Sequence, residues 1–173
     1  MTFQEAFKNL EILEGGFTVD DGGPTQYGIT QNSWNAYCDD RDIPHFPVHL
    51  ITLEEASNFY ADCYWNPLCC NQLPDGVDFA LFQWAINHEY MGNEGPAVKD
   101  LQLCVGATPD GVMGPKTIKS VRSKDPKKVI ECLLNRQVQW YINDAKVNAD
   151  APLIGWENRV DRVKQILGLA HGD

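Results

Sequence analysis

The sequence predicts a mainly α-helical fold with one small β-hairpin, and three patterns lead to this prediction. Apolar residues recur at spacings of three and four through most of the chain, as they do in helices that pack on a core. Two capping boxes, Thr2 with Glu5 and Thr52 with Glu55, mark helix starts. The glycine-rich stretch 15–28 instead favours a turn between short strands.

The first helix is expected over residues 2–13. An apolar stripe follows one face of this helix, and Glu14 continues the stripe where Gly15 and Gly16 should end the helix. The stripe has spacings of four, three and four residues, and consists of Phe3, Phe7, Leu10 and Glu14.

Glu14 is a candidate general acid because of this position. The C-terminal end of a helix carries partial negative charge, and apolar surroundings disfavour an ionised carboxylate. Both effects are expected to raise the pKa of Glu14, whereas Asp20 or Asp21, in a solvated loop, should stay ionised. Two carboxyl groups in opposite protonation states are typical of acid-assisted glycoside cleavage. The alternative is a helix-end residue that points into water.

A small hairpin is expected to follow. Residues 27–30 should pair with residues 17–19, which would hold Asp20 and Thr25 opposite the end of the first helix. A short helix over residues 31–37 comes next.

The segment 38–49 is predicted to be a solvated loop. Its acidic and histidine side chains suggest a metal site as an alternative, but Pro44 and Pro47 exclude a regular helix that would align them. These side chains are Asp39, Asp40, Asp42, His45 and His49.

Two pairs of residues on the next two helices are candidates for substrate binding. A helix over 52–64 ends at Tyr64 and Trp65, whose rings either stack on sugar rings or pack in the core. A helix from Asp75 or Asp78 to Asn87 is apolar on nearly every side and should lie in the middle of the molecule. Its polar exceptions are Gln83 and Asn87. A buried amide needs a partner, which is either a protein group or a bound acetamido sugar.

The second half of the chain predicts further helices. The first covers residues 96–105, and the second begins at Gly114–Pro115. The third begins at residue 125 and ends at 144 or 147, and the last covers 156–169. For Arg159 in the last helix a surface ion pair is expected, and the alternatives are a pair with a buried carboxylate or a role in steadying the cleft. Because no repeat or linker separates the halves, one domain over 1–173 is predicted, with a catalytic-motif lobe 1–66 and a helical lobe 67–173.

Short motifs are found from the first helix to the last. The N-terminal ones are Glu14–Gly15–Gly16–Phe17, Asp20–x–Gly22–Gly23–x–Thr25 and Gly28–Ile29–Thr30. Later ones are Tyr64–Trp65–Asn66–Pro67, Asp110–Gly111–x–x–Gly114–Pro115 and Gly155–Trp156–x–x–Arg159. Over nearly the whole chain they resemble the signature of the glycoside hydrolase family 108 muramidases, which are phage endolysins and secretion-associated lysozymes. The helical lobe 67–173 resembles the C-terminal region of this family, which is predicted to bind peptidoglycan.

The resemblance implies a lysozyme-like fold and hydrolysis of the β-1,4 bond between N-acetylmuramic acid and N-acetylglucosamine in peptidoglycan. It implies that Glu14 is the general acid, that Asp20 or Asp21 is the second carboxylate, and that Thr25 positions water. Neither a metal nor an organic cofactor is expected. The predicted substrate-binding residues are Tyr27, Tyr64, Trp65, Gln83 and Asn87. The alternative is a non-catalytic peptidoglycan-binding protein on the same scaffold.

The charge of the chain limits its partners. With 14 basic and 24 acidic residues, the net charge is 14 − 24 = −10, which argues against nucleic acid and against a polybasic membrane anchor. No apolar run approaches the ~20 residues of a membrane span. The expected partner is therefore a peptidoglycan glycan strand, bound in a cleft of a monomer.

The cysteines and the N-terminus predict where the protein is made. None of the six cysteines forms a CxxC pair, and no apolar leader follows Met1. Free thiols in a protein made in the cytoplasm are expected. The resemblance implies that a holin or a secretion machinery then releases the enzyme to the cell wall in the periplasm.

Overall fold

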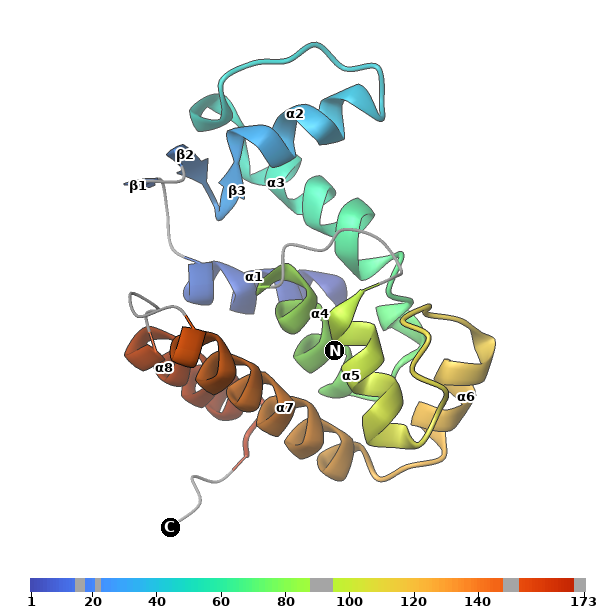
Figure 1. The fold of residues 1–173 in the computed structure, drawn as a ribbon. Coiled ribbons are helices and arrows are strands. Elements are labelled where there is room, and N and C mark those ends of the chain that lie inside the picture. The colour runs from blue at the N-terminus through green and yellow to red at the C-terminus, as the bar shows by residue number, and fades with distance from the viewer. Residues whose placement is uncertain (15–17, 21–22, 88–94, 148–152, 170–173) are drawn as a thin grey trace. The chain divides into compact units, whose positions relative to one another are not determined.

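The computed structural model describes residues 1–14, 18–20, 23–87, 95–147 and 153–169. Within these ranges the chain is mainly helical with one small antiparallel sheet (Figure 1), which confirms the predicted fold class. The chain divides into two compact units, Thr2–Cys63 and Tyr64–Asp173, and Met1 belongs to the second. The unit boundary lies three residues (66 − 63) before the boundary expected between the lobes. That both form one domain stays a prediction.

The unit Thr2–Cys63 begins with helix α1, Phe3–Glu14. The predicted capping box is confirmed: the Thr2 backbone N–H donates to Glu5 Oε2 at 2.8 Å, and the Glu5 N–H donates to Thr2 Oγ1 at 3.3 Å. Phe7 and Leu10 on the expected stripe are buried. The sequence therefore predicted both the start and the inward face of this helix.

A three-stranded antiparallel sheet follows, in the order β1 (Thr18–Asp20), β2 (Gly23–Gln26) and β3 (Ile29–Thr30). The predicted pairing of 27–30 with 17–19 is wrong, because β3 pairs with β2, with Gln26 opposite Ile29. The physical reason is the turn at Tyr27 and Gly28, where φ is 52° and 78°. Two consecutive residues of positive φ make a tight two-residue turn, which pairs neighbouring strands.

Helices α2 (Gln31–Asp39) and α3 (Leu53–Tyr60) complete this unit. Short 3₁₀ helix η1 (Val48–Leu50) lies in the loop between them. The capping box of α3 is confirmed, and the chain continues from α3 as a π-helical segment, η2 (Ala61–Trp65). Leu53, the first residue of α3, is 45% exposed. An aromatic cluster forms the core here: Trp34, Tyr37, Phe46 and Phe59.

Helix α4 (Val77–Asn87) is the centre of the second unit, because every side chain from Val77 to Ile86 is buried. This confirms the prediction from its apolar sequence. Asp78, one of two expected helix starts, lies in the first turn, where its Oδ1 accepts hydrogen bonds from the N–H groups of Gly76 and Phe79 at 2.8 and 2.7 Å. The 3₁₀ helix η3 (Cys70–Gln72) packs beside α4.

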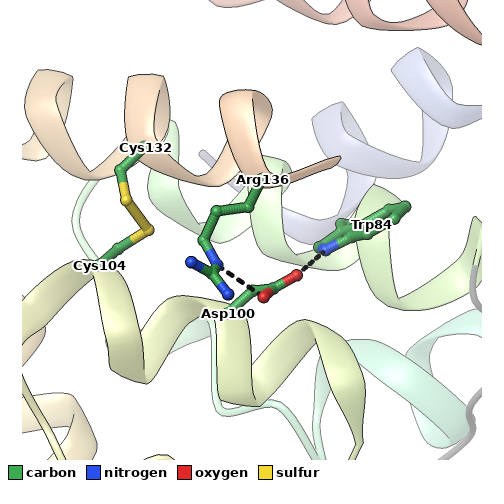
Figure 2. Close-up of a disulfide and its surroundings, with 5 residues drawn as sticks. All are labelled: Trp84, Asp100, Cys104, Cys132 and Arg136. Carbon is green, nitrogen blue, oxygen red and sulfur yellow. Dashed lines mark hydrogen bonds and ion pairs between the residues drawn. A yellow bond between two sulfur atoms is a disulfide. The ribbon is translucent and has the colours of Figure 1, made fainter. Parts of the chain in front are cut away.

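Helices α5 (Pro96–Val105) and α7 (Pro126–Val147) both pack on α4. Helix α6 (Pro115–Arg122) lies against α5 and α7, and helix α8 (Leu153–Ile166) lies against α7. A disulfide between Cys104 and Cys132 joins α5 to α7, with 5.8 Å between the Cα atoms (Figure 2). The prediction of free thiols is therefore wrong for these two cysteines. Their pairing depends on how α5 packs on α7, which cysteine spacing alone does not reveal.

Candidate active site

Glu14 is the last residue of α1. The last turn of α1 contains no basic residue. No cation of this helix therefore offsets the partial negative charge at its C-terminal end. The Glu14 side chain lies outside what the structure describes, as do residues 15–17. Its role as general acid therefore stays a prediction that depends on its place in the sequence and at the helix end.

Two of the other predicted catalytic residues lie on the sheet. Asp20 ends β1 opposite Gly23, and Thr25 on the central strand β2 lies between Thr18 and Thr30. The side chain of Asp20 and all of Asp21 lie outside the described residues. The choice between the two aspartates stays open.

Tyr27 occupies a conformation that few non-glycine residues adopt, with φ of 52° in the turn after Thr25. The Tyr60 hydroxyl of α3 donates to the Tyr27 carbonyl at 2.8 Å. Helix α3 thus holds the turn that connects β2 to β3. A left-handed backbone conformation costs a non-glycine residue of order 1–3 kcal/mol, and such residues are found preferentially at functional sites. The conformation of Tyr27 therefore favours its predicted role in substrate binding.

Tyr64 and Trp65 belong to the second unit and are buried, with exposed fractions of 5% and 1%. Trp65 Nε1 donates to Asn71 Oδ1 at 2.8 Å, and the Trp65 ring packs edge to face on Phe82. The sequence left two alternatives open for both residues, and the geometry favours packing in the core. Direct contact with sugar stays a prediction.

Gln83 and Gln137 exchange hydrogen bonds between the middle of α4 and α7. Gln83 Nε2 donates to Gln137 Oε1 at 2.9 Å and to the Ala80 carbonyl at 3.1 Å. Gln83 Oε1 accepts from Gln137 Nε2 at 3.4 Å and from Arg159 Nε at 3.5 Å. Both glutamines are fully buried. Protein groups therefore supply partners for the Gln83 amide, which favours the structural interpretation of this residue.

Asn87, at the end of α4, joins the same network through Tyr141. Gln137 Nε2 donates to the Tyr141 hydroxyl at 2.7 Å, and this hydroxyl donates to Asn87 Oδ1 at 2.5 Å. Asn87 is only half-buried, and within the described part of the chain its Nδ2 group makes no hydrogen bond to protein. Its two N–H donors suit the carbonyl oxygen of an acetamido sugar, so Asn87 keeps its predicted role.

Sequence reasoning missed Gln137 and Tyr141 as members of this network. The available signal was Gln137 itself, a polar residue on the otherwise apolar stripe of α7. A buried amide on such a stripe requires a partner on the facing helix, and Gln83 was the matching polar residue on α4.

Among the residues that the structure describes, no group of three or more His, Cys, Asp and Glu side chains is able to hold an ion. Of the side chains considered as ligands in 38–49, Asp39 and His45 contact each other, with 2.7 Å between Oδ1 and Nε2. None of the described helices is long and apolar enough to cross a membrane.

Comparison with known proteins gives a family and a related structure. The glycosyl hydrolase 108 family model matches residues 7–88, which include the motif from Glu14 to Thr30. The solved structure of SagA from Brucella abortus is 31% identical to the chain and covers 99% of it, with 97% of the SagA chain matched and a TM-score of 0.78. Among curated proteins, none matches the chain.

Proposed function

Because this chain belongs to the glycosyl hydrolase 108 family, and is therefore a glycoside hydrolase, we propose that its substrate is peptidoglycan. The bond cleaved is the β-1,4 bond between N-acetylmuramic acid and N-acetylglucosamine, so the enzyme is an N-acetylmuramidase. The observation that supports this most is that the family match contains the complete run from Glu14 to Thr30.

In this proposal the Glu14 carboxyl group protonates the oxygen of the leaving sugar as the glycosidic bond breaks. Positive charge develops on the ring of the other sugar, and Asp20 or Asp21 stabilises it as an ionised carboxylate. Thr25 positions the water that adds to the sugar. That water loses one proton, which restores the catalytic acid.

The separation of the two carboxyl groups decides the stereochemical course. About 5–5.5 Å makes the aspartate a nucleophile and retains configuration, whereas about 6.5–9.5 Å leaves room for a water and inverts it. Proton NMR of the first product formed from a soluble substrate distinguishes the two courses.

The test is a comparison of wild type with Glu14→Gln, with Glu11→Gln as the matched control. Glu11 lies one turn earlier on α1. We expect Glu14→Gln to clear permeabilised Gram-negative cells at least ~100-fold more slowly, because general acid help is removed. Glu11→Gln should clear them at the wild-type rate. Equal clearing by wild type and Glu14→Gln would refute the role of Glu14.

Mass spectrometry of the released fragments tests the bond specificity. A muramidase leaves N-acetylmuramic acid at the new reducing end. N-acetylglucosamine there identifies a glucosaminidase, and a 1,6-anhydro sugar identifies a transglycosylase. Wild type that binds purified walls but releases no fragment would support the non-catalytic binding protein instead.

We further propose that the enzyme acts in the periplasm as an endolysin or secretion-associated lysozyme. The Cys104–Cys132 disulfide supports this site of action, because disulfides persist in oxidising compartments and are rare in the cytoplasm. Release by a holin or a secretion machinery would bring the chain there. Alkylation of free thiols in cytoplasmic and periplasmic fractions should show this pair reduced in the first and oxidised in the second.

A further inference from the structure

The disulfide between Cys104 and Cys132 lies beside a groove on the second unit. The groove encloses about 590 Å³ along one face of α7. Both cysteine side chains are half-buried, but Cys132 lines the groove and Cys104 does not. A molecule that enters the groove therefore reaches Cys132 first.

We propose that Cys132 is the thiol through which the reduced chain receives this disulfide, by exchange with a disulfide-bearing oxidant in the groove, and that Cys104 then completes the bond. The oxidant is the disulfide of a small molecule or of a thiol–disulfide oxidoreductase. The inference goes beyond the proposed hydrolase function and does not depend on it, because it concerns the oxidation of the chain itself.

Charges on α7 favour a thiolate at Cys132. Lys128 precedes this residue by four positions and Arg136 follows it by four, so both cations lie on its face of the helix. Nearby cations stabilise a thiolate, which is the form that attacks a disulfide. The groove also contains two carboxylates, Glu131 and Asp100, and Arg136 Nε is 2.6 Å from Asp100 Oδ1 (Figure 2). Because Arg136 is paired, Lys128 is expected to contribute more to the thiolate.

The surroundings of Cys104 favour the protonated thiol instead. Cys104 is the second-last residue of α5, and the last turn of this helix contains no basic residue. The partial negative charge at the C-terminal end of a helix disfavours a thiolate. Asp100 lies one turn earlier on the same face of α5, and its negative charge acts in the same direction. The two thiols of the reduced chain are therefore unequal, and Cys132 is the better nucleophile at neutral pH.

Most of the free cysteines are less suited to this exchange. Burial raises the pKa of Cys63 to about 12, and it also raises the pKa of Cys38 and that of Cys70. These three thiols therefore stay protonated at neutral pH, and Cys38 and Cys70 are also buried. Cys69 is the fourth free thiol, so its replacement by serine simplifies the measurement.

The exchange has two steps, which conserve atoms and electrons. The Cys132 thiol loses its proton to solvent, and its thiolate attacks one sulfur of the oxidant, whose other sulfur leaves as a thiolate. The Cys104 thiol then loses its proton, and its thiolate attacks Cys132 Sγ in the mixed disulfide, which releases the second sulfur of the oxidant. The two cysteines together lose two electrons and two protons, and the oxidant disulfide is reduced to two thiols.

A polar contact between the same helices prepares the second step. On α5, Asp100 lies one turn from Cys104 (Figure 2). On α7, Arg136 lies one turn from Cys132. The ion pair of Asp100 with Arg136, and the hydrogen bond from Trp84 Nε1 to Asp100 Oδ2 at 3.1 Å, join α5 to its neighbours without the disulfide. Cys104 is therefore held near Cys132, and closure is an intramolecular step with a high effective concentration.

The experiment follows oxidation of the reduced, full-length chain by glutathione disulfide at neutral pH, in a Cys69→Ser background. Peptide mass mapping after an acid quench locates each mixed disulfide. Cys104→Ser should trap glutathione on Cys132 about three- to tenfold faster than Cys132→Ser traps it on Cys104. The expected ratio is modest because a larger thiolate fraction is partly offset by a lower nucleophilicity. Equal rates at the two positions, or faster capture at Cys104, would overturn the inference.

A charge variant that keeps both cysteines tests the same inference without a serine substitution at either. Lys128→Glu should slow disulfide closure about two- to threefold, because it replaces the cation near Cys132 by an anion. Lys127→Glu is the matched control, since it makes the same change of net charge at an adjacent exposed lysine outside the groove. It should close at the wild-type rate. Equal closure rates for the two variants would contradict the role of the groove.

A parallel series with an oxidised CxxC oxidoreductase in place of glutathione disulfide distinguishes the two sources of the oxidant. The oxidant that closes the bond faster is the better substrate of the groove. The dependence of closure on Lys128 should hold for that oxidant, and its absence would also overturn the inference.

Discussion

Tyr37 shows how burial and one carboxylate determine the protonation of a side chain in this protein. Burial raises the pKa of Tyr37 to about 12, and a hydrogen bond from its hydroxyl to Asp62 Oδ2 at 3.1 Å acts in the same direction. Arg41, whose guanidinium carbon lies 4.0 Å from the centre of the Tyr37 ring, opposes the shift in this pKa. The neutral phenol is therefore part of the folded unit Thr2–Cys63.

This shift predicts a loss of stability at alkaline pH. The pKa of Tyr37 is higher in the folded state than its ordinary value of 10. The stability that the neutral phenol contributes is therefore fully present below pH 10 and is lost as the pH rises to about 12. The loss should be roughly 1–3 kcal/mol of unfolding free energy. Urea unfolding of wild type and Tyr37→Phe between pH 9 and 12 measures it, and the variant should decline less. Parallel pH profiles would contradict the prediction.

The Gln83–Gln137 pair gives a second prediction for single residues. Gln137→Leu keeps the approximate volume but leaves Gln83 and the Tyr141 hydroxyl without the hydrogen bonds that Gln137 makes. A buried polar group without a partner costs about 1–3 kcal/mol, so the free energy of unfolding should fall by about 2–4 kcal/mol. Gln139→Leu, two residues along on the exposed side of α7, should change it by less than about 0.5 kcal/mol. Equal unfolding midpoints for the two variants would show that the pair contributes nothing measurable.

At the scale of elements, local signals predicted the helices well. Each capping box joins two residues that are three positions apart, Thr2 with Glu5 and Thr52 with Glu55. Because both partners of the interaction lie within one helical turn, the local sequence is enough to predict where these helices start. Strand pairing was predicted wrongly because it depends on turn geometry. No Asn–Gly or Gly–Gly pair marks the turn at Tyr27 and Gly28, and a tyrosine with positive φ is not expected from sequence.

Prediction of the candidate site was limited by contacts between distant residues. Gln83 and Asn87 were identified as polar exceptions on an apolar helix, but Gln137 and Tyr141 lie 54 residues later. Trp65 was left open between core and sugar because an aromatic residue at a helix end has no periodicity that separates the two. The disulfide was missed for the same reason, since Cys104 and Cys132 are 28 residues apart on different helices.

The disulfide predicts how strongly α5 is held to α7. In the chain-entropy model, closing a loop of 28 residues stabilises the fold by about 3–4 kcal/mol. The double variant Cys104→Ser/Cys132→Ser should lose about this amount in urea unfolding, and reductant should lower the stability of wild type to the same level. Cys69→Ser, which removes a free thiol, is the control. If reductant leaves the wild-type midpoint unchanged, the pair contributes no such constraint.

At the scale of the whole molecule, the net charge of −10 is the dominant electrostatic feature. Bacterial walls are often anionic, so the enzyme and its proposed substrate repel each other at long range. Repulsion between exposed charges acts over the Debye length, which falls from about 30 Å at 0.01 M salt to about 8 Å at 0.15 M. Salt should therefore assist the encounter, because no attraction between opposite net charges is present for it to screen.

The rate of wall clearing by wild type should accordingly rise several-fold as salt increases from about 10 to 150 mM at neutral pH. The gain should come from faster association, since salt has little effect on interactions inside a water-excluded site. Binding of an uncharged β-1,4-linked N-acetylglucosamine hexamer is the control, and its affinity should change by less than about twofold because no long-range repulsion affects it. Turbidity assays on walls and isothermal titration of the hexamer, made in the same buffers, provide the comparison. A clearing rate that falls steadily with salt would mean that a local basic surface attracts the wall despite the net charge.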